Sequence, residues 1–451
     1  MEKGDIVIVF KARLFFVSYD AFFYPISLYN YARFSGDKMT TTPTITTRRR
    51  VPRGKCDEFF FEKRKMNDDE KTINGCCCCS CCNDDDEHHS VVLFYKYVAL
   101  SRDCLPSLRD ALEKEMTKLE VRGKIRVSVE GINATASGRE SAVEEFERRL
   151  KKKRGDGGED ELLFEMLELK DVDFKTERVK RSEDEEDGRG CKHIFEDASV
   201  RIVDEVCPFE PSSKKNDKKG SIDGVGLERH RPNRLTPSEW REAIRTSDDD
   251  DDVVVLDVRN SYESRMGRFV PEKTVCCPIR RFNQFKEWVE EKGGKEYIEN
   301  KRVFAYCTGG VRCEKASAYL LSLNVTKEVS VLEGGIVAYA RDVGGDGFVG
   351  KNYVFDARGC VDVGDDDDEK NNYALTTCDG CNAPCLPRLA RCASKACHVI
   401  LAACKECSKS STSSIYCCET CKANKDGEKK LACECDSYRS RESRCKVPAA
   451  L

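Results

Sequence analysis

Residues 303–321 read VFAYCTGGVRCEKASAYLL and carry the clearest structural signal in the chain. The first four residues form a short apolar run, which is typical of a strand buried in a parallel sheet. The chain then turns through two glycines into a segment whose apolar residues have helical spacing. Because α/β sheets bind ligands at the carboxyl ends of their strands, we expect a functional site where this strand ends, at Cys307.

The turn that follows the strand has the composition of an anion-binding loop. Its glycines allow several backbone N–H groups to converge on one point, and the N-terminus of a helix favours negative charge. A cysteine at this point should have a lowered pKa and act as a thiolate nucleophile. The alternative is a strand-to-helix turn around an inert buried cysteine. The candidate catalytic residues are Cys307 and Arg312, and the loop between them consists of Thr308, Gly309, Gly310 and Val311.

Loop length distinguishes two kinds of thiol enzyme. In Cys-dependent protein phosphatases, the loop between the cysteine and the arginine is one residue longer than residues 308–311. A shorter loop suits a persulfide sulfur better than a tetrahedral phosphate. The spacing therefore favours sulfur chemistry.

The flanking sequence predicts that residues 236–350 form a domain with a central parallel sheet. Thr236-Pro237-Ser238-Glu239 is a capping box with proline at the first helical position. Residues 253–258 (VVVLDV) and 329–332 (VSVL) are further apolar runs, and residues 282–291 have the pattern of a helix. Alternating strands and helices predict an α/β fold.

Upstream, residues 91–206 predict an α+β domain of the ferredoxin-like (acylphosphatase-like) kind, with element order βαββαβ. Residues 130–135 have the composition of a turn, residues 151–160 and 179–190 are expected to be charged loop insertions, and residues 207–235 a linker. The expected strands cover residues 91–98, 124–129, 162–169 and 198–206, and the expected helices cover residues 103–119 and 140–151.

Residues 351–451 contain cysteines at metal-ligand spacing. Pairs with the spacing Cys-x2-Cys occur three times, and one Cys-x4-Cys pair adds a fourth. Four thiolates satisfy tetrahedral zinc, so eight would bind about two structural ions. The alternative is low-complexity cysteine without metal, and Cys417 and Cys418 compete for one position. The expected zinc ligands are Cys378, Cys381, Cys392, Cys397, Cys404, Cys407, Cys418 and Cys421.

Residues 1–90 show no pattern that predicts a fold, and we expect a disordered or targeting segment. From Met39 the sequence is basic and threonine-rich, which is typical of organelle targeting but is explained equally well by a solvated tail or a start at Met39. The cysteine tract at residues 76–82 lacks the spacing of any one metal site and stays unassigned.

Composition limits the possible partners. The net charge is −4, from 77 Lys and Arg against 81 Asp and Glu, so a nucleic-acid partner would need a local basic patch. No apolar run is long enough for a membrane-spanning helix, so no membrane partner is expected. The chain has 28 cysteines and no clear signal peptide, which favours a reducing compartment. We expect the cytoplasm, or an organelle if the N-terminal segment is a targeting signal.

Several motifs together resemble a known family. These are LDVR (residues 256–259), CTGGVRCEKA (307–316), LEGGI (332–336), EGIN (130–133) and GKNYVFDAR (350–358). The chain resembles rhodanese-domain proteins, in the branch that contains the bacterial tRNA wobble-uridine hydroxylases and the animal thiosulfate sulfurtransferase/rhodanese-like domain-containing protein 2. The similarity covers most of residues 91–421.

The resemblance implies roles for individual residues. Cys307 corresponds to the active cysteine, and Asp257 and Arg259 would lie at the pocket edge and support the loop, although a buried ion pair is an equal alternative. Cys313 would protect or resolve an oxidised Cys307, unless it is simply a small apolar helix residue. Arg268 stands where many rhodaneses have a histidine, which removes one candidate proton carrier.

Three functions follow from these observations. The first is sulfur transfer, in which Cys307 takes a sulfane sulfur from a small donor as a persulfide and passes it to an acceptor. The second, implied by the bacterial relatives, is oxygen-dependent hydroxylation of a tRNA wobble uridine, with basic residues 151–154 contacting phosphate. The third is a non-catalytic zinc-bearing interaction protein. No organic cofactor is predicted, and the sequence favours sulfur transfer.

Overall fold

The described part of this computed structural model comprises residues 88–152, 159–179, 194–195, 197–209, 224–246, 250–270, 274–364, 375–394, 397, 399–409 and 414–425. The predicted disordered or targeting segment lies outside these residues except for its last three, and so does the cysteine tract at residues 76–82. Within the described ranges, no helix is long and apolar enough to cross a membrane.

The first sheet, which we call the N-terminal sheet, has the order β4-β1-β3-β2-β5. Strand β5 runs parallel to β2, and the other neighbours are antiparallel. This order is that of a ferredoxin-like fold with one added strand. Its elements are β1 (His89–Tyr97), α1 (Leu105–Lys118), β2 (Arg122–Ser128), β3 (Gly131–Arg139), α2 (Glu140–Lys151), α3 (Glu159–Glu165), β4 (Lys175–Arg178) and β5 (Ala198–Ile202).

Two expectations for this region were wrong. Residues 162–169 belong to the end of α3 and the turn after it, with Phe164 and Leu167 buried and Leu162 exposed, because the apolar residues follow helical rather than strand spacing. Residues 130–135 are mostly strand β3, which begins at Gly131. A Cβ at Gly131 would lie 2.0 Å from a backbone oxygen, so glycine is required for the tight approach to β1.

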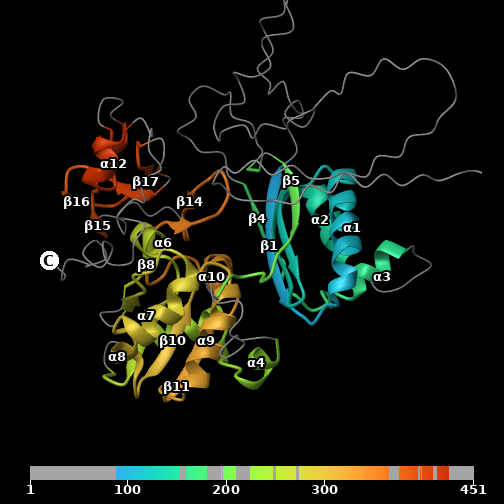
Figure 1. Cartoon of the computed structure of the whole chain (residues 1–451), viewed down its shortest axis with the longest axis horizontal. Coiled ribbons are helices and arrows are strands. Elements are labelled where there is room, and N and C mark those ends of the chain that lie inside the picture. The colour runs from blue at the N-terminus through green and yellow to red at the C-terminus, as the bar shows by residue number, and fades with distance from the viewer. Residues whose placement is uncertain are drawn as a thin grey trace, which may run out of the picture. The chain divides into compact units, whose positions relative to one another are not determined.

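The two faces of the N-terminal sheet have different neighbours. Helices α1 and α2 lie side by side on one face, joined by a 2.6 Å ion pair between Glu115 and Arg149 (Figure 1). Strand β1 contributes Phe94 to the core beneath these helices. Since side chains alternate along a strand, Leu93, Tyr95 and Tyr97 point to the opposite face.

The second sheet, the parallel sheet, has the order β6-β11-β10-β7-β9, and every neighbouring pair in it is parallel. This confirms the predicted α/β fold, and the capping box at Thr236 and Glu239 is present at the start of α5. Its strands are β6 (Asn233–Leu235), β7 (Val253–Asp257), β9 (Thr274–Cys276), β10 (Arg302–Tyr306) and β11 (Glu328–Leu332). Its helices are α5 (Pro237–Arg245), α6 (Ser261–Met266), α7 (Phe285–Glu291), α8 (Gly294–Ile298), α9 (Val311–Leu323) and α10 (Gly335–Asp342).

Helices cover both faces of the parallel sheet. One core contains Phe285 and Trp288 of α7 with Tyr319 of α9, and the other contains Trp240 of α5 with Tyr339 of α10. Within residues 207–235, expected as a linker, the structure describes helix α4 (Gly224–Arg229) and strand β6, and Cys207 and Phe209 are buried in the first of these cores. Strands β8 (Gly267–Phe269) and β12 (Phe348–Gly350), far apart in the sequence, form a separate two-stranded antiparallel sheet.

The cysteine-rich region consists of small hairpins and short helices. Its core is made largely of cysteine side chains, with Leu401 and Ile415 among the few large apolar residues. Its elements are β13 (Asn352–Tyr353), β14 (Cys360–Val361), β15 (Thr376–Thr377), β16 (Pro384–Cys385), β17 (Arg388–Arg391), β18 (Ile400–Ala403), α11 (Lys405–Lys409) and α12 (Glu419–Ala423).

Candidate active site

Cys307 lies at the carboxyl end of β10, the middle strand of the parallel sheet. The loop that follows it enters α9 through Gly310, whose φ of +96° is in the left-handed region that favours glycine. The backbone N–H groups of Ile336 and Val337, at the start of α10, donate to the carbonyl oxygens of Cys307 and Thr308 at 3.0 Å each. Two helices thus begin at this loop, as the sequence predicted for the first of them.

The environment of Cys307 stabilises a thiolate. Its side chain is fully buried, and the N–H of Gly310 donates to its Sγ at 3.1 Å. Burial raises the pKa of the thiol, but the Cys313 thiol, the Arg312 charge and the N–H groups of both residues lower the pKa to about 5. The sulfur therefore carries a negative charge at neutral pH, which is what a nucleophile needs.

Cys313 has the opposite character. It is buried in the first turn of α9, where burial and the neighbouring thiolate raise its pKa well above the ordinary range. Its thiol stays protonated and donates a hydrogen bond to the sulfur of Cys307. The structure thus brings Cys313 into the site as a hydrogen-bond donor.

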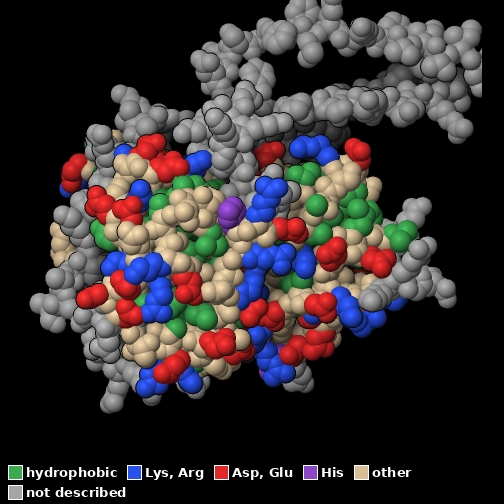
Figure 2. Space-filling view, turned by 90° about the horizontal axis from the view of Figure 1, so that it is seen from below, with side chains coloured by type: hydrophobic (Ala, Val, Ile, Leu, Met, Phe, Trp, Pro, Cys, Tyr) green, Lys and Arg blue, Asp and Glu red, His purple; other side chains and the backbone are tan. Residues whose placement is uncertain are grey.

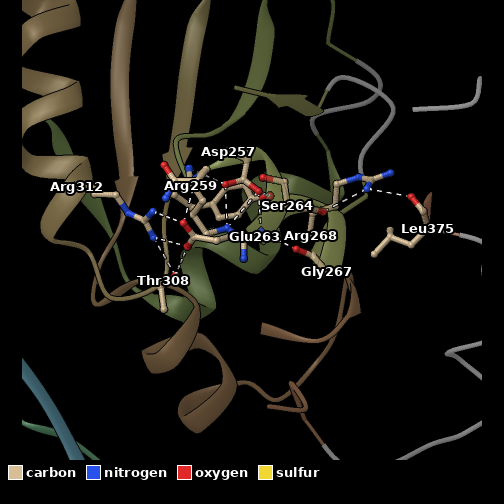
Figure 3. Close-up of polar contacts among 11 residues, drawn as sticks. Asp257, Arg259, Glu263, Ser264, Gly267, Arg268, Thr308, Arg312 and Leu375 are labelled. Atoms are coloured by element: carbon tan, nitrogen blue, oxygen red, sulfur yellow. Dashed lines mark hydrogen bonds and ion pairs between the residues drawn. The ribbon is translucent and has the colours of Figure 1, made fainter. Parts of the chain in front are cut away.

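Arg312 is fixed by a buried carboxylate, as Figure 3 shows. Its two terminal nitrogens donate to the two oxygens of Glu263 at 2.7 and 2.8 Å, and one of them also donates to Thr308 Oγ1 at 3.0 Å. Glu263 is fully buried, and sequence reasoning assigned it no role. The signal that could have found it is the capping box Asn260-x-x-Glu263, which is present at the start of α6.

Asp257 and Arg259 form a fully buried ion pair, with Arg259 Nη2 at 2.7 Å from Asp257 Oδ2. Tyr306, the residue before Cys307, donates its hydroxyl to the same oxygen at 2.8 Å. Burial raises the pKa of Asp257, but Arg259 outweighs this and lowers it. The structure therefore shows a fully buried ion pair that is joined to β10 through Tyr306.

Arg268 points away from Arg312 (Figure 3). It donates to the carbonyl oxygens of Ser264 and Leu375 at 3.4 and 3.3 Å. It therefore connects β8 to the cysteine-rich region and has no contact with the Arg312 network.

Leu93, Tyr95 and Tyr97, the side chains of β1 that point away from α1 and α2, cover the loop. A Cβ on Gly309 would lie 2.4 Å from Leu93 Cδ2, and one on Gly310 would lie 2.8 Å from the Tyr95 hydroxyl. Tyr97 donates its hydroxyl to the carbonyl oxygen of Val311 at 3.2 Å. The loop can pass under the N-terminal sheet because both central residues are glycines.

A buried lysine joins α9 to the N-terminal sheet. Lys315 is 1 % exposed and pairs with Glu130 at 3.0 Å and Glu205 at 2.6 Å. Glu130, the glutamate of the EGIN motif, also accepts the backbone N–H of Val206 at 2.6 Å. The EGIN motif thus anchors the helix that carries Arg312.

One aromatic side chain close to the site is exposed. Phe355 follows β13, is 49 % exposed, and has its ring 5.8 Å from the guanidinium carbon of Arg312. Tyr353 supports this ring edge-on at 5.2 Å and contacts Tyr262 in turn. The arrangement presents a flat apolar surface beside a buried cation.

Among the described residues, two groups of four cysteines could each hold a metal ion, and the four Sγ atoms of each group lie within 4.8 Å of one another. Thiolates 2.3 Å from a tetrahedral ion are about 3.8 Å apart, and the Sγ separations of 3.7 and 3.9 Å, one in each group, fit this geometry. The groups alternate along the chain. The first contains Cys378, Cys381, Cys404 and Cys407, and the second contains Cys392, Cys397, Cys417 and Cys421.

The ligand set expected from sequence needs one correction. Cys417, not Cys418, completes the second group, because its side chain is fully buried among the other three sulfurs. Cys418 is the N-cap residue of α12 and is partly exposed.

The basic stretch expected to contact phosphate is only partly described. Lys151 is paired with Glu147 at 2.8 Å, Lys152 is exposed, and residues 153–154 lie outside the described ranges. On the face shown in Figure 2, basic and acidic side chains are interspersed. The charge on this face is mixed, in keeping with the small net charge of the chain.

Comparison with protein families gives three matches. Residues 89–206 match the UPF0176 acylphosphatase-like domain, residues 239–342 match the rhodanese-like domain, and residues 349–422 match the rhodanase C-terminal domain.

Comparison with individual proteins agrees with these matches. The chain is 34 % identical over 276 residues to a tRNA uridine(34) hydroxylase from Staphylococcus saprophyticus, covering 60 % of this chain and 73 % of that protein. A tRNA uridine(34) hydroxylase from Cytophaga hutchinsonii is 30 % identical, with 74 % and 90 % covered. Rhodanese-like domain-containing protein 6 from Arabidopsis thaliana is also 30 % identical, but the match spans 76 % of this chain and only 54 % of that longer protein.

Proposed function

Since this chain belongs to the rhodanese-domain family, in the branch whose members include proteins named tRNA uridine(34) hydroxylase, we propose that it hydroxylates a tRNA wobble uridine with Cys307 as its reactive thiolate. The observation that carries the proposal is the thiolate itself. Cys307 is held in a loop with converging N–H groups, beside Arg312, and has a pKa of about 5. The proposal reverses the order of preference that loop length alone suggested.

A thiolate suits this chemistry because a uracil ring is electrophilic at C6. Addition of Sγ to C6 forms a carbon–sulfur bond and moves the electron pair of the C5–C6 double bond onto C5 and the C4 carbonyl oxygen. C5 thereby becomes electron-rich and bonds to one oxygen atom of dioxygen, while a two-electron donor of the thiol class, supplied from outside the chain, reduces the other oxygen atom to water. Loss of the C5 proton and expulsion of Sγ from C6 then restore the C5–C6 double bond and the free thiolate. The neutral thiol of Cys313 and the cation of Arg312 keep the sulfur ionised before the addition.

Phe355 supports the choice of a nucleotide substrate. Proteins that bind unpaired bases stack them on exposed aromatic rings, and each stacked base contributes about 1–3 kcal/mol. An aromatic ring that is half exposed beside Arg312 is suited to this purpose. In this proposal Phe355 stacks on the extruded uracil.

Sulfur transfer is the second candidate, favoured by the length of the loop between Cys307 and Arg312. The same N–H groups that stabilise the thiolate would stabilise a persulfide and the anion that develops when sulfur is passed on. The two functions differ in substrate and share the nucleophile.

We further propose that each four-cysteine group holds one structural zinc ion. Zinc would supply the cross-links that a region with so few large apolar residues needs in order to fold. The sulfur separations and the alternation of the two ligand sets along the chain support this assignment.

The test of hydroxylation is nucleoside mass spectrometry of tRNA from cells that lack the protein, complemented with wild type, Cys307→Ala or Phe355→Ala. Wild type should restore a 5-hydroxyuridine-derived nucleoside, Cys307→Ala should restore none, and Phe355→Ala should restore it only partly. Tyr297→Ala is the control, because Tyr297 is 54 % exposed on α8.

An oxidised-uridine profile that does not change when the protein is removed would overturn the hydroxylase proposal. Sulfur transfer would then be tested by thiocyanate formation from thiosulfate and cyanide, which Cys307→Ser should abolish. Equal restoration by Phe355→Ala and wild type would remove the stacking role and leave that of Cys307 intact.

A further inference from the structure

Lys175 extends from the N-terminal sheet toward the active-site loop. It begins β4 and lies directly opposite Leu93 of β1. Residues opposite each other in a sheet place their side chains on the same face, and Leu93 is the side chain that lies against Gly309. Although it carries a charge, Lys175 is only 5 % exposed.

The ammonium of Lys175 has few partners for a buried charge. Its one hydrogen bond in the described part of the chain is to the carbonyl oxygen of Asp173 at 3.4 Å, and its nitrogen lies 5.4 Å from the centre of the Tyr95 ring. No carboxylate in the described residues pairs with it within 4.0 Å. Buried charges are normally paired and fully hydrogen-bonded, so this ammonium has donors to spare.

The side chain of Lys175 also approaches the loop that carries Cys307. Its Cε would be 3.0 Å from a Cβ on Gly334, the N-cap residue of α10. The next residue, Gly335, packs against the carbonyl oxygen of Cys307. Burial lowers the pKa of Lys175 and the charge of Arg341 adds to this, while the charges of Asp173, Cys307 and Glu333 raise the pKa again in part.

We propose that Lys175 binds an oxyanion of the substrate next to Cys307, so that the N-terminal sheet supplies one residue of the active site. The ammonium supplies the positive charge and the donors for this anion. The first N–H groups of α10 already donate to the carbonyl oxygens of Cys307 and Thr308, so α10 contributes only the positive potential of its N-terminal end. The anion is a phosphodiester if the substrate is RNA, or the sulfonate end of thiosulfate if it is a sulfur donor. The inference rests on Cys307 being the reactive thiol, as proposed above, but on neither reaction in particular.

Two alkylating reagents test this position, because they deliver the same carbon with and without a negative charge. The rates at which iodoacetate and iodoacetamide modify Cys307 would be measured by peptide mass spectrometry at pH 7 on the full chain. Lys175→Met should slow iodoacetate about fivefold and leave iodoacetamide nearly unchanged, as expected for a screened pair of single charges. Lys175→Arg should keep the wild-type ratio, and Lys118→Met, an exposed lysine on α1, should not alter it.

The outcomes separate this inference from the function it rests on. An unchanged ratio in Lys175→Met, or an equal slowing of both reagents, would overturn the anion position, since the second result indicates a purely structural lysine. A Cys307 in wild type that reacts no faster at pH 7 than the other thiols would instead overturn the reactive thiolate.

Protection from iodoacetamide identifies the source of the anion. The arms are an anticodon stem-loop RNA with uridine at the wobble position, and sulfate as an unreactive substitute for thiosulfate. Protection by RNA that is weaker in Lys175→Met assigns the position to a phosphodiester, and the same result with sulfate alone assigns it to a small sulfur donor. Protection that is equal in both proteins would contradict the proposal.

Discussion

Burial and three residues set the charge of Cys307, and they do not act in the same way. Burial opposes ionisation, while Arg312 acts through its charge and Gly310 and Cys313 act through hydrogen bonds. Glu263 pairs with Arg312 at 2.7 Å, and its negative charge offsets much of the attraction between Arg312 and the thiolate. Hydrogen bonds to the sulfur therefore contribute a larger share of the stabilisation of the thiolate. The donor that can be removed with the least change in shape is the thiol of Cys313.

Replacing Cys313 should therefore shift the titration of Cys307. A thiol whose pKa is lowered in the folded protein reacts as a thiolate above that pKa and loses its reactivity as the pH falls through it, so wild-type alkylation should have its midpoint near pH 5. Cys313→Ala removes one donor and should raise the midpoint to about 6.

The matched variant is Cys313→Ser, whose hydroxyl can donate the same hydrogen bond and should keep the midpoint low. The pH dependence of iodoacetamide modification at Cys307 would give all three values. If the midpoint in Cys313→Ala stayed where it is in wild type, the thiol would be no more than a small buried side chain.

Helix α9 joins the active site to the N-terminal sheet. Its first turns place Arg312 and Cys313 at the thiolate, Glu314 against Tyr95 at 2.9 Å, and Lys315 between the carboxylates of Glu130 and Glu205. Neighbouring residues on one helix point in different directions, so these four side chains contact different parts of the structure. The position of the loop depends on the anchor at Lys315.

Lys315→Met should lower the free energy of unfolding more than the loss of a surface ion pair would. It leaves Glu130 buried without its cation, and breaking a buried pair in this way costs about 3–5 kcal/mol. Arg148→Met is the control, because Arg148 is 62 % exposed in its pair with Glu145 and such pairs contribute about 0–1 kcal/mol. Urea unfolding would measure both free energies, and similar losses in the two variants would contradict the anchoring role.

The sequence correctly predicted those helices and strands that are marked by apolar runs, glycines or helix caps within a few residues. The apolar run before Cys307 and the glycines after it indicated strand, loop and helix, and the capping box at Thr236 indicated the start of α5. The sequence did not predict strand β4, because this strand is short and polar and Lys175 is its only buried residue. The capping box marks Glu263 in the sequence, but its pairing with Arg312 and the approach of Lys175 to the active-site loop follow only from tertiary structure. The choice of Cys417 over Cys418 depends on which side chain points inward.

Helix α6 connects the cysteine-rich region to the active site. Glu263 on this helix holds Arg312, and two residues later Arg265 donates to Asp379 at 3.0 Å and to the carbonyl oxygen of Thr377 at 2.9 Å. Asp379 lies between the first-group cysteines Cys378 and Cys381 and also accepts the backbone N–H of Ala402. A change in the fold around these cysteines should therefore reach the site through α6.

Removal of zinc should then affect more than the cysteine-rich region. The full chain should release about two zinc ions to a chelator, and thermal unfolding should shift to lower temperature because metal binding in such regions supplies folding free energy. Cys392→Ser should lose about one of the two ions, whereas Cys385→Ser should keep both, because Cys385 is buried beside the first group without belonging to it. Inductively coupled plasma mass spectrometry of the purified variants gives the metal content, and iodoacetamide kinetics at Cys307 show whether the loss reaches the thiolate. If the chain bound no zinc, the proposed zinc sites would be wrong. If zinc removal changed neither the thermal stability nor the alkylation rate of Cys307, the metal would not stabilise the fold.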